Sequence, residues 1–292
     1  MSDQITTAFV NQYSNNVYML AQQFGSKLNQ AVDVERVKGE KAFFDQIGAT
    51  SVQQRASRHA DTPLIAVPHS RRMVTMTTYD TADLIDDPDQ VKTLIDPTNP
   101  YARSMAAAMG RQRDDLIISA ARGTAYTGAD GTSTQTLPSG QKVAVDFTGS
   151  NSDLNVEKVI EAKKILLNND VDVDMEESYF VIAPHQLGSL LNTTEVTSSD
   201  YNTVKALVRG EIDTWMGFTF IVTTRLPISS NTRYNLAFVK SGIKVADGYN
   251  VTGKISERAD KNYSTQVWYS MMMGSTRMEE EKVVEVACDE SA

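Results

Sequence analysis

Aspartates that alternate with valines give the chain its best likeness to a metal site. They stand at Asp170, Asp172 and Asp174. Alternate carboxylates open a calcium-binding loop, but such a loop also needs a glycine at its sixth position and a glutamate at its twelfth. Here those positions hold Met175 and Val181, so the pattern favours a strand edge or a turn over a calcium site.

A second acidic cluster could supply paired carboxylates or a divalent-ion site. It consists of Asp80, Asp83, Asp86, Asp87 and Asp89. Capping and turn chemistry account for it better, because Asp80 or Thr81 can cap a helix that begins at Ala82, and Asp-Asp-Pro is a turn sequence. We therefore predict no metal here.

Motifs for nucleophilic, zinc or phosphate chemistry are absent from the sequence. His59, His69 and His185 have no partner at metal-ligand spacing, and neither a GxSxG elbow nor a glycine-rich phosphate loop occurs. The single cysteine, Cys288, stands beside two acidic residues that would raise its thiol pKa. We predict no catalytic residue, no cofactor and no metal, and hence a protein that is not an enzyme.

The composition of the chain limits the kinds of partner that the protein can have. The 292 residues carry 28 Lys and Arg against 37 Asp and Glu, a net charge of −9, which argues against a protein that grips nucleic acid phosphates. No apolar run is long enough to span a membrane, and the start of the chain lacks a secretory signal, so we expect a cytoplasmic product.

Residues 34–79 are polar and extended, with few side chains able to face a core of their own. A segment this long suits a projecting hairpin that contacts another molecule. Its basic residues could touch phosphate or pair with acidic surface on another copy, and the net charge favours the second. The hairpin's candidate contact residues are Phe43, Phe44, Arg55, Arg58, Arg71 and Arg72.

The elements that must position these residues are organised around residues 96–123. Asn99 and Pro100 are typical of a helix start, and Arg122 and Gly123 of a helix end, where Gly123 can adopt the left-handed conformation. Apolar residues recur between them at helical spacing, which predicts an amphipathic helix roughly 33 Å long.

The segments before and after this predicted helix differ in their residue patterns. Residues 5–28 place Phe9, Tyr13 and Val17 at helical spacing and predict an arm, laid either on its own domain or on a neighbouring subunit. Residues 150–250 alternate helix and strand, and from 249 onward the chain becomes β again. The fold class is therefore α+β.

The order of these parts resembles the major capsid protein of tailed bacteriophages, of the Hong Kong 97 type. The local resemblance runs from Arg71-Arg72-Met73-Val74-Thr75 through Asp83-Leu84-Ile85-Asp86 to Leu94-Ile95-Asp96-Pro97-Thr98, followed by Gly110-Arg111 and Asp114-Asp115. It implies an N-terminal arm at 1–33, an extended loop at 34–79, a peripheral domain with a spine helix at 80–150 and 250–292, and an axial domain at 151–249.

The resemblance also implies a function: self-assembly, as hexamers and pentamers, into the icosahedral shell around a double-stranded DNA genome. The implied partners are a separate scaffolding protein, a portal, a decoration protein in some relatives, and DNA by non-specific contact, without a membrane. The shell would belong to the virion and assemble in the host bacterial cytoplasm. Two alternatives stay open: a soluble α+β hydrolase or transferase with a lid at 34–79, and a self-associating tail component.

Overall fold

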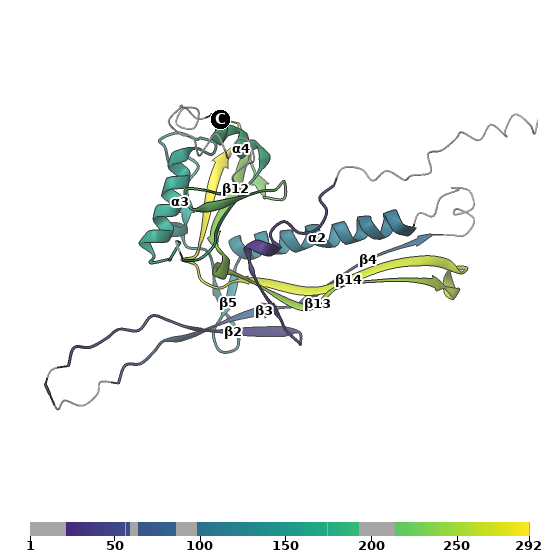
Figure 1. Ribbon diagram of the computed structural model, residues 1–292, viewed down its shortest axis with the longest axis horizontal. Coiled ribbons are helices and arrows are strands. Elements are labelled where there is room, and N and C mark those ends of the chain that lie inside the picture. Colours follow the sequence, from purple (N-terminus) through teal and green to yellow (C-terminus); the bar gives the residue numbers. More distant parts are fainter. Residues whose placement is uncertain are drawn as a thin grey trace, which may run out of the picture. The chain divides into compact units, whose positions relative to one another are not determined.

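A computed structural model of the chain describes residues 22–55, 57–58, 64–85, 98–173, 175–192 and 214–291. The described helices and strands form a mixed α+β fold with three sheets (Figure 1). In chain order the elements are β1 (Asp33–Arg36), β2 (Lys41–Ile47), β3 (His69–Thr75), β4 (Thr77–Ile85), α2 (Thr98–Arg122), β5 (Ala125–Thr127), β6 (Ser133–Gln135), β7 (Lys142–Val143), α3 (Val156–Asn168), β8 (Ser178–Ile182), α4 (Pro184–Asn192), β9 (Thr214–Trp215), β10 (Phe218–Val222), β11 (Ile228–Ser229), β12 (Thr232–Val239), β13 (Ile243–Arg258), β14 (Ser264–Arg277) and β15 (Val283–Asp289).

The chain divides into two compact units, and each is described by itself. The first unit draws on Met1–Ser26, Thr78–Arg111 and Asn250–Met271, and the second on Lys27–Thr77, Gln112–Tyr249 and Met272–Ala292. Four elements contribute residues to both units: α2, β13, β14 and, by its first residue Thr77, β4.

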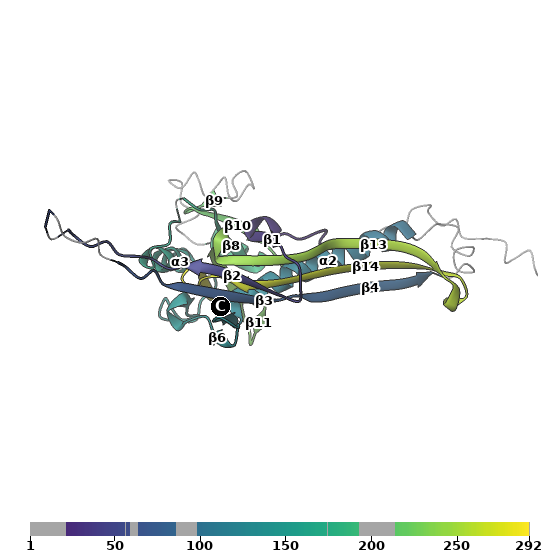
Figure 2. The same ribbon diagram turned by 90° about the horizontal axis from the view of Figure 1, so that it is seen from below.

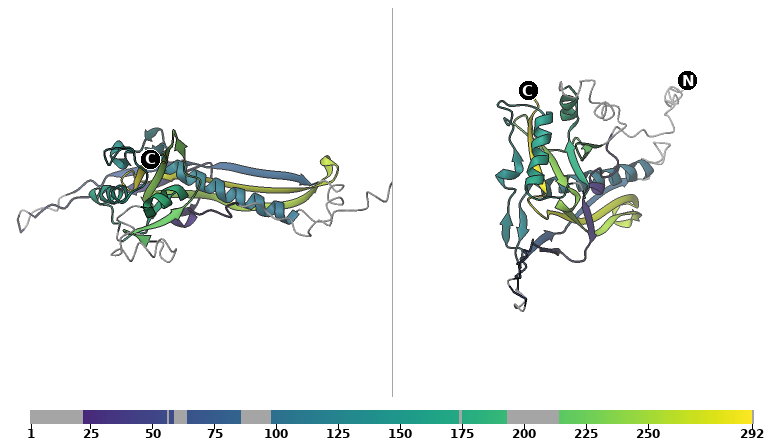
Figure 3. Two further views of the ribbon diagram at one scale, coloured as in Figure 1. Left: turned by 90° about the horizontal axis from the view of Figure 1, so that it is seen from above. Right: turned by 60° about the vertical axis from the view of Figure 1, so that its left-hand side comes forward.

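A seven-stranded sheet in the order β7-β15-β12-β8-β10-β9, with β11 beside β12, forms the core of the second unit. The helices α3 and α4 lie beside this sheet (Figure 3). Phe180 of β8 stacks on Phe220 of β10 at 5.4 Å between ring centroids, and meets Phe218 edge-on at 5.6 Å. Val159 and Leu166 of α3 complete the core, since both are fully buried against these strands.

The strand β15 lies inside this sheet, paired antiparallel with β12 and parallel with β7. The sequence-based division had placed residues 250–292 apart from 151–249. Val284, Val286 and Cys288 of β15 are instead buried in the same core as α3 and β8. The last strand of the chain therefore completes the domain that residues 151–249 begin.

A second sheet in this unit has the order β2-β3-β5-β6. β2 and β3 pair along their whole length, from Lys41 opposite Thr75 to Ile47 opposite His69 (Figure 2). Beyond them the backbone closes with a hydrogen bond from Gly48 N to Pro68 O at 2.8 Å. The turn between β5 and β6 contains Asp130-Gly131, a dipeptide typical of hairpin turns, with Gly131 at a φ of +66°.

The third sheet has the order β1-β13-β14-β4. The expected helix at Ala82 is wrong, because β4 continues as a strand to Ile85. Threonine, tyrosine and alternating polarity favour a strand here, and they prevail over the capping potential of Asp80. β13 is the longest strand described, with 16 residues. Within the first unit, Met105 of α2 packs on Val267 of β14.

The helix α2 begins and ends close to the predicted residues, over 25 residues. The reason for its end differs from the prediction, because Gly123 is not left-handed. A Cβ at Gly123 would lie 2.6 Å from the Ser119 carbonyl oxygen, and Gly123 N donates to that oxygen at 2.8 Å. Glycine is needed there for space. None of the described helices has the length and apolarity to cross a membrane.

Candidate functional site

The histidine and serine nearest to a catalytic arrangement share one carboxylate. His185 Nδ1 lies 2.8 Å and Ser189 Oγ 2.5 Å from the same oxygen, Oδ2 of Asp153. The hydroxyl therefore donates to the carboxylate and not to the imidazole, which is the wrong partner for activating a nucleophile. Within the part of the chain that the structure describes, no group of three or more His, Cys, Asp and Glu could hold a metal ion.

The cysteine is a core residue. Cys288 is fully buried in β15, where Asn235 Nδ2 donates to its sulfur at 3.2 Å. Burial raises the pKa of the thiol to about 12. The predicted direction of this pKa shift is right, but its cause is burial in a strand and not the two neighbouring acidic residues.

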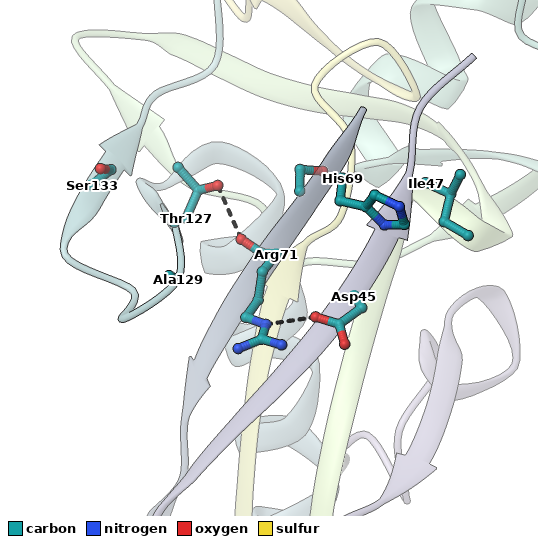
Figure 4. A pocket seen from close by; sticks show the side chains of 9 residues that line it. Asp45, Ile47, His69, Arg71, Thr127, Ala129 and Ser133 are labelled. Carbon is teal, nitrogen blue, oxygen red and sulfur yellow. Dashed lines mark hydrogen bonds and ion pairs between the residues drawn. The ribbon is translucent and has the colours of Figure 1, made fainter. Parts of the chain in front are cut away.

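The β2–β3 hairpin carries an exposed ion pair and a shallow hollow. Arg71 Nε donates to Asp45 Oδ1 at 2.5 Å, and the Arg71 guanidinium lies 5.6 Å from the Phe43 ring centroid. This hydrogen bond lowers the pKa of Asp45. Together with His69, Ile47 and the β5–β6 turn, the pair lines a hollow of about 780 Å³ (Figure 4).

On β3, the residue after Arg71 points into a buried charge cluster. Arg72 Nη2 donates to Glu280 Oε2 at 2.6 Å, and Arg72 Nε donates to the Met278 carbonyl at 2.8 Å. Arg277 Nε and Nη2 lie 3.4 Å from the other Glu280 oxygen. Two cations therefore share one carboxylate, and all three side chains are at least nine-tenths buried. We call Arg72, Arg277 and Glu280 the buried triad.

Arg277 links the triad to two other elements. Its Nη1 donates to the carbonyls of Ala121 and Gly123 at 2.9 and 2.8 Å, and its Nη2 to Gln135 O at 3.0 Å. A cation is well placed at the carbonyls that end a helix, because they carry the negative end of the helix dipole. The triad thus fixes β3, the end of α2 and β6 to one point.

The segment beyond the hairpin strands is exposed. Val52 and Leu64 are 94% and 99% exposed to solvent, and Arg55 and Arg58 are exposed as well. Both apolar side chains therefore lie on one extended segment with almost no cover from the rest of the described chain. We call residues 48–68, as far as the structure describes them, the hairpin tip.

The structure separates the predicted contact residues into three groups. Phe43 and Arg71 lie on the exposed side of the hairpin, and Arg55 and Arg58 at its tip. Phe44 is 7% exposed in a small core with Val74, and Arg72 belongs to the buried triad, so these two stabilise the hairpin from within. The remaining three, Phe9, Tyr13 and Val17, lie outside the described residues.

Sequence reasoning missed Glu280, Arg277 and Asp114. Three consecutive glutamates, Glu279-Glu280-Glu281, are typical of a solvent-exposed turn, but Glu280 is buried in the triad. Asp114 is fully buried and accepts the backbone N–H groups of Lys27 and Leu28, each at 3.1 Å. The sequence carries only a weak signal for these residues: Asp114 is an acid near the middle of an amphipathic helix, and Arg277 is an arginine at the end of a strand.

Comparisons with known proteins agree with this geometry. The profile of a family described as "Phage capsid protein" matches residues 5–290. No curated protein sequence matches significantly. The fold is similar to the capsid structure of the cyanophage P-SCSP1u, with a TM-score of 0.75 and 16% identity, over 97% of this chain and 94% of that one.

Two further solved structures extend this likeness. The capsid of Ralstonia phage GP4 has a TM-score of 0.74 at 10% identity, over 96% of this chain and 95% of that one. A structure of Mycobacterium phage Che8 has a TM-score of 0.70 at 16% identity, over 95% and 97%. At these identities the likeness shows a shared fold.

Proposed function

The chain belongs to the phage capsid protein family, and from that membership we propose how its parts build a shell. It is a major capsid protein of a tailed phage, it forms the shell of the virion, and its copies associate into capsomers. The family resemblance of residues 71–128 is thereby confirmed. The same finding favours a shell subunit over the two alternatives, a hydrolase or transferase with a lid at 34–79 and a tail component.

We assign the described elements to the parts that such proteins share. In this proposal α2 is the spine helix, residues 1–33 are the N-terminal arm, and 34–79 are the extended loop. The axial domain is 151–249 together with β15, because β15 pairs with β12 inside that sheet. The peripheral domain comprises 80–150 and the outer parts of β13 and β14.

The hairpin tip is the part that reaches a neighbouring copy. The supporting observation is the exposure of Val52 and Leu64 at the end of a hairpin whose strands have their own small core. Two apolar side chains of this kind each gain about 1.5–3 kcal/mol when a partner covers them. Arg55 and Arg58 supply positive charge that suits an acidic surface on that neighbour.

The buried triad sets the direction in which the hairpin leaves the second unit. It joins β3 to the end of α2 and to the turn after β14, through interactions that water does not screen. A shell needs every copy to present its contact segments at the same angle. Contacts that are weak one at a time then act together around a closed surface.

Several partners belong to this proposal. Copies form hexamers and pentamers of an icosahedral shell, with a separate scaffolding protein, a portal and, on some shells, a decoration protein. Packaged DNA touches the shell without specific contacts, as the net charge of −9 favours. Assembly takes place in the host cytoplasm, and the role is structural and not catalytic.

The test removes the hairpin tip and keeps its strands. Residues 49–67 are replaced by an Asn-Gly turn, which leaves Gly48 and Pro68 to close the β2–β3 ladder. We expect a subunit with unchanged circular dichroism and unchanged thermal melting that forms no closed shells in negative-stain images, alone or with a co-expressed scaffold. Normal shells from this variant would remove the tip from its proposed role.

Point variants distinguish the tip's apolar contacts from its mere length. Replacing Val52 and Leu64 by Asp should abolish or strongly reduce shell yield, because charges cannot take the place of buried apolar groups. The matched control replaces Gln53 and Gln54, which lie in the same segment, by Ser and should assemble normally. Equal shell yields from both pairs would contradict the apolar contact.

A further inference from the structure

The outer face of α3 carries a small apolar hollow. Val159, Ala162 and Leu166 of this helix are buried in the core of the seven-stranded sheet, whereas Ile160 and Leu167 are 46% and 48% exposed. Residues seven apart lie on the same side of a helix, two turns from each other. The hollow between them measures about 260 Å³ and is lined by Ile160, Lys163, Lys164, Leu167, Asn168 and Met216. We call it the α3 hollow.

The rim of the α3 hollow is positively charged. Among the described residues, Lys163 has no hydrogen-bond or ion-pair partner. Its Nζ reaches the β9–β10 turn, because a Cβ at Gly217 would lie 3.1 Å from it. Lys164 pairs at 3.0 Å with Glu161 of its own helix and is 60% exposed, and an exposed pair of this kind is weak. The hollow therefore suits a partner that combines an apolar side chain with negative charge.

The segment that follows α3 has this complementary chemistry. Asp170 and Asp172 are exposed, and neither carboxylate has a hydrogen-bond or ion-pair partner in the described part of the chain. Met175 is 83% exposed, more than any other large apolar side chain described outside the hairpin tip. Glu176 and Glu177 add negative charge, although Ser241 and Lys240 bind them. We call residues 170–177, apart from 174, the acidic loop.

The acidic loop presents these side chains from a fixed backbone. Val171 and Val173 are buried in the core of the seven-stranded sheet, while Asp170 and Asp172 are exposed. Glu176 N donates to the carbonyl oxygen of Asp172 at 3.2 Å and closes the loop. The alternation of aspartate and valine, which fails as a calcium loop, thus becomes an alternation of exposed carboxylates and buried anchors.

We propose that the α3 hollow of one copy binds the acidic loop of a neighbouring copy. Met175 enters the hollow, and Asp170 and Asp172 lie beside Lys163 at its rim. Methionine suits this role, because its unbranched side chain adapts to irregular apolar surfaces. The inference rests on the proposed shell function, which brings many identical copies into contact.

Charge selects the acidic loop of a second copy as the occupant. The hairpin tip is the other exposed apolar segment, but it carries Arg55 and Arg58, which would meet Lys163 and Lys164 at the rim. Like charges across an interface suppress such a pairing, and opposite charges favour it. Within one chain the contact is not made, since Met175 is 83% exposed.

The hollow and the loop are different parts of the surface. Each copy can therefore give its loop to one neighbour and receive a loop from another, as a ring of identical copies requires. Neither part includes a residue of the hairpin tip, so the two contacts are tested separately. Assembly that depends on the tip but not on Met175 or Lys163 would contradict this inference and leave the proposed function intact.

The first test places cysteines on the two sides of the expected contact. Chains with Met175→Cys and chains with Leu167→Cys are co-assembled and oxidised, so that only a contact between copies can join positions 175 and 167. We expect a disulfide-linked dimer on non-reducing gels, with mass spectrometry joining these two positions. The native Cys288 adds no background because it is fully buried.

The matched control replaces Leu167→Cys by Glu157→Cys. Glu157 is exposed on the same helix but lies roughly 15 Å from Leu167 along the axis, which is beyond the reach of one disulfide. Equal dimer yields with the two acceptors would overturn the proposal. Efficient linkage of Leu167→Cys to Val52→Cys would assign the hollow to the hairpin tip instead.

A charge exchange tests the rim. Lys163→Glu and Asp172→Lys should each lower shell yield several-fold, because each places like charges opposite each other, with unchanged circular dichroism of the subunit. The combined variant should recover most of the yield, and Glu157→Lys should have no effect. A combined variant that assembles no better than the single ones contradicts the pairing.

Should the substituted chains not assemble, wild-type shells decide. Shells are built from a mixture of isotope-labelled and unlabelled chains and treated with a carbodiimide, which joins a carboxylate to an amine in contact with it. We expect peptides that join Lys163 or Lys164 of one label to Asp170 or Asp172 of the other. Their absence, with cross-links found elsewhere in the shell, would overturn the proposal.

Discussion

Arg72 Nη2 lies 2.6 Å from Glu280 Oε2, and neither side chain is more than 9% exposed. Their positions are 208 residues apart in the chain. Arg277 adds a second cation to the same carboxylate, although burial lowers the pKa of its guanidinium. One negative charge therefore neutralises two buried positive charges at the base of the hairpin. Of the three members of the buried triad, Glu280 is the one whose replacement we expect to destabilise the subunit most.

Replacing Glu280 by Gln should destabilise the unassembled subunit by about 3 kcal/mol. The change leaves two buried guanidinium groups without a counter-charge, and breaking a buried pair from one side typically costs that much. The measurement is a urea unfolding curve monitored by tryptophan fluorescence.

The control for this variant is Glu279→Gln. Glu279 is 45% exposed and pairs with Lys282 at 3.4 Å, so its loss should change the free energy of unfolding by less than about 1 kcal/mol. Similar losses in both variants would mean that the burial of Glu280 contributes nothing specific.

Asp114→Asn should release the segment around Leu28 from α2. An amide oxygen can accept only one of the two backbone N–H groups in the present geometry, and its NH₂ group faces the other. An unsatisfied buried donor costs about 1–3 kcal/mol. Hydrogen exchange at Lys27 and Leu28 should accelerate in the variant.

The neighbouring residue provides the control for this loss. Asp115 binds Arg225 at the surface, with side chains 31% and 35% exposed, so Asp115→Asn should leave exchange at Lys27 and Leu28 unchanged. Faster exchange in both variants would point to a general loss of helix stability and not to the cap on Leu28.

Gly110→Ala should lower the melting temperature although alanine is the better helix former. In the middle of a helix this exchange normally stabilises by up to about 1 kcal/mol. Here the added Cβ would lie 2.4 Å from the carbonyl carbon of Gly25, so the two backbones would have to separate. Gly188 in α4 is the control, because a Cβ there meets nothing within 4 Å. Gly188→Ala should raise the melting temperature, and a rise in both variants would contradict the close contact.

Cys288 should not react with thiol reagents in the folded subunit and should react only when the subunit unfolds. Burial raises its pKa to about 12, above the usual value of about 8.5. Between these values the unfolded chain loses the proton and the folded chain keeps it, so stability is fully present below the usual pKa and declines as pH rises toward 12.

The slope of that decline is at most about 1.4 kcal/mol per pH unit. Urea unfolding between pH 8 and 10.5 measures it, and Cys288→Ala corrects for the other groups that titrate there. A variant with the same slope as wild type, or rapid labelling of the native thiol, would contradict a buried neutral cysteine.

Local sequence patterns predicted the elements that depend on local backbone and burial preferences. Asn99, Pro100 and Gly123 marked both ends of α2, and Asp130-Gly131 marked the β5–β6 turn. The hairpin followed from the extended polarity of residues 34–79. The pattern failed at Asp80, because cap residues and strand residues overlap in type and only the partner strand decides between them.

Partners in three dimensions could not be predicted in the same way. From its neighbours in the sequence, Glu280 belongs to a solvent-exposed acidic run. In the structure, Arg72 of β3 and Arg277 of β14 enclose it. The family resemblance groups residues 250–292 with the spine helix, but in the structure β15 pairs with β12 on one side and β7 on the other. The sequence by itself determined which residues become helix, strand or turn, because those choices depend on near neighbours. Tertiary structure alone decided which charges are buried together and which strands become neighbours, because those depend on segments that meet across the whole chain.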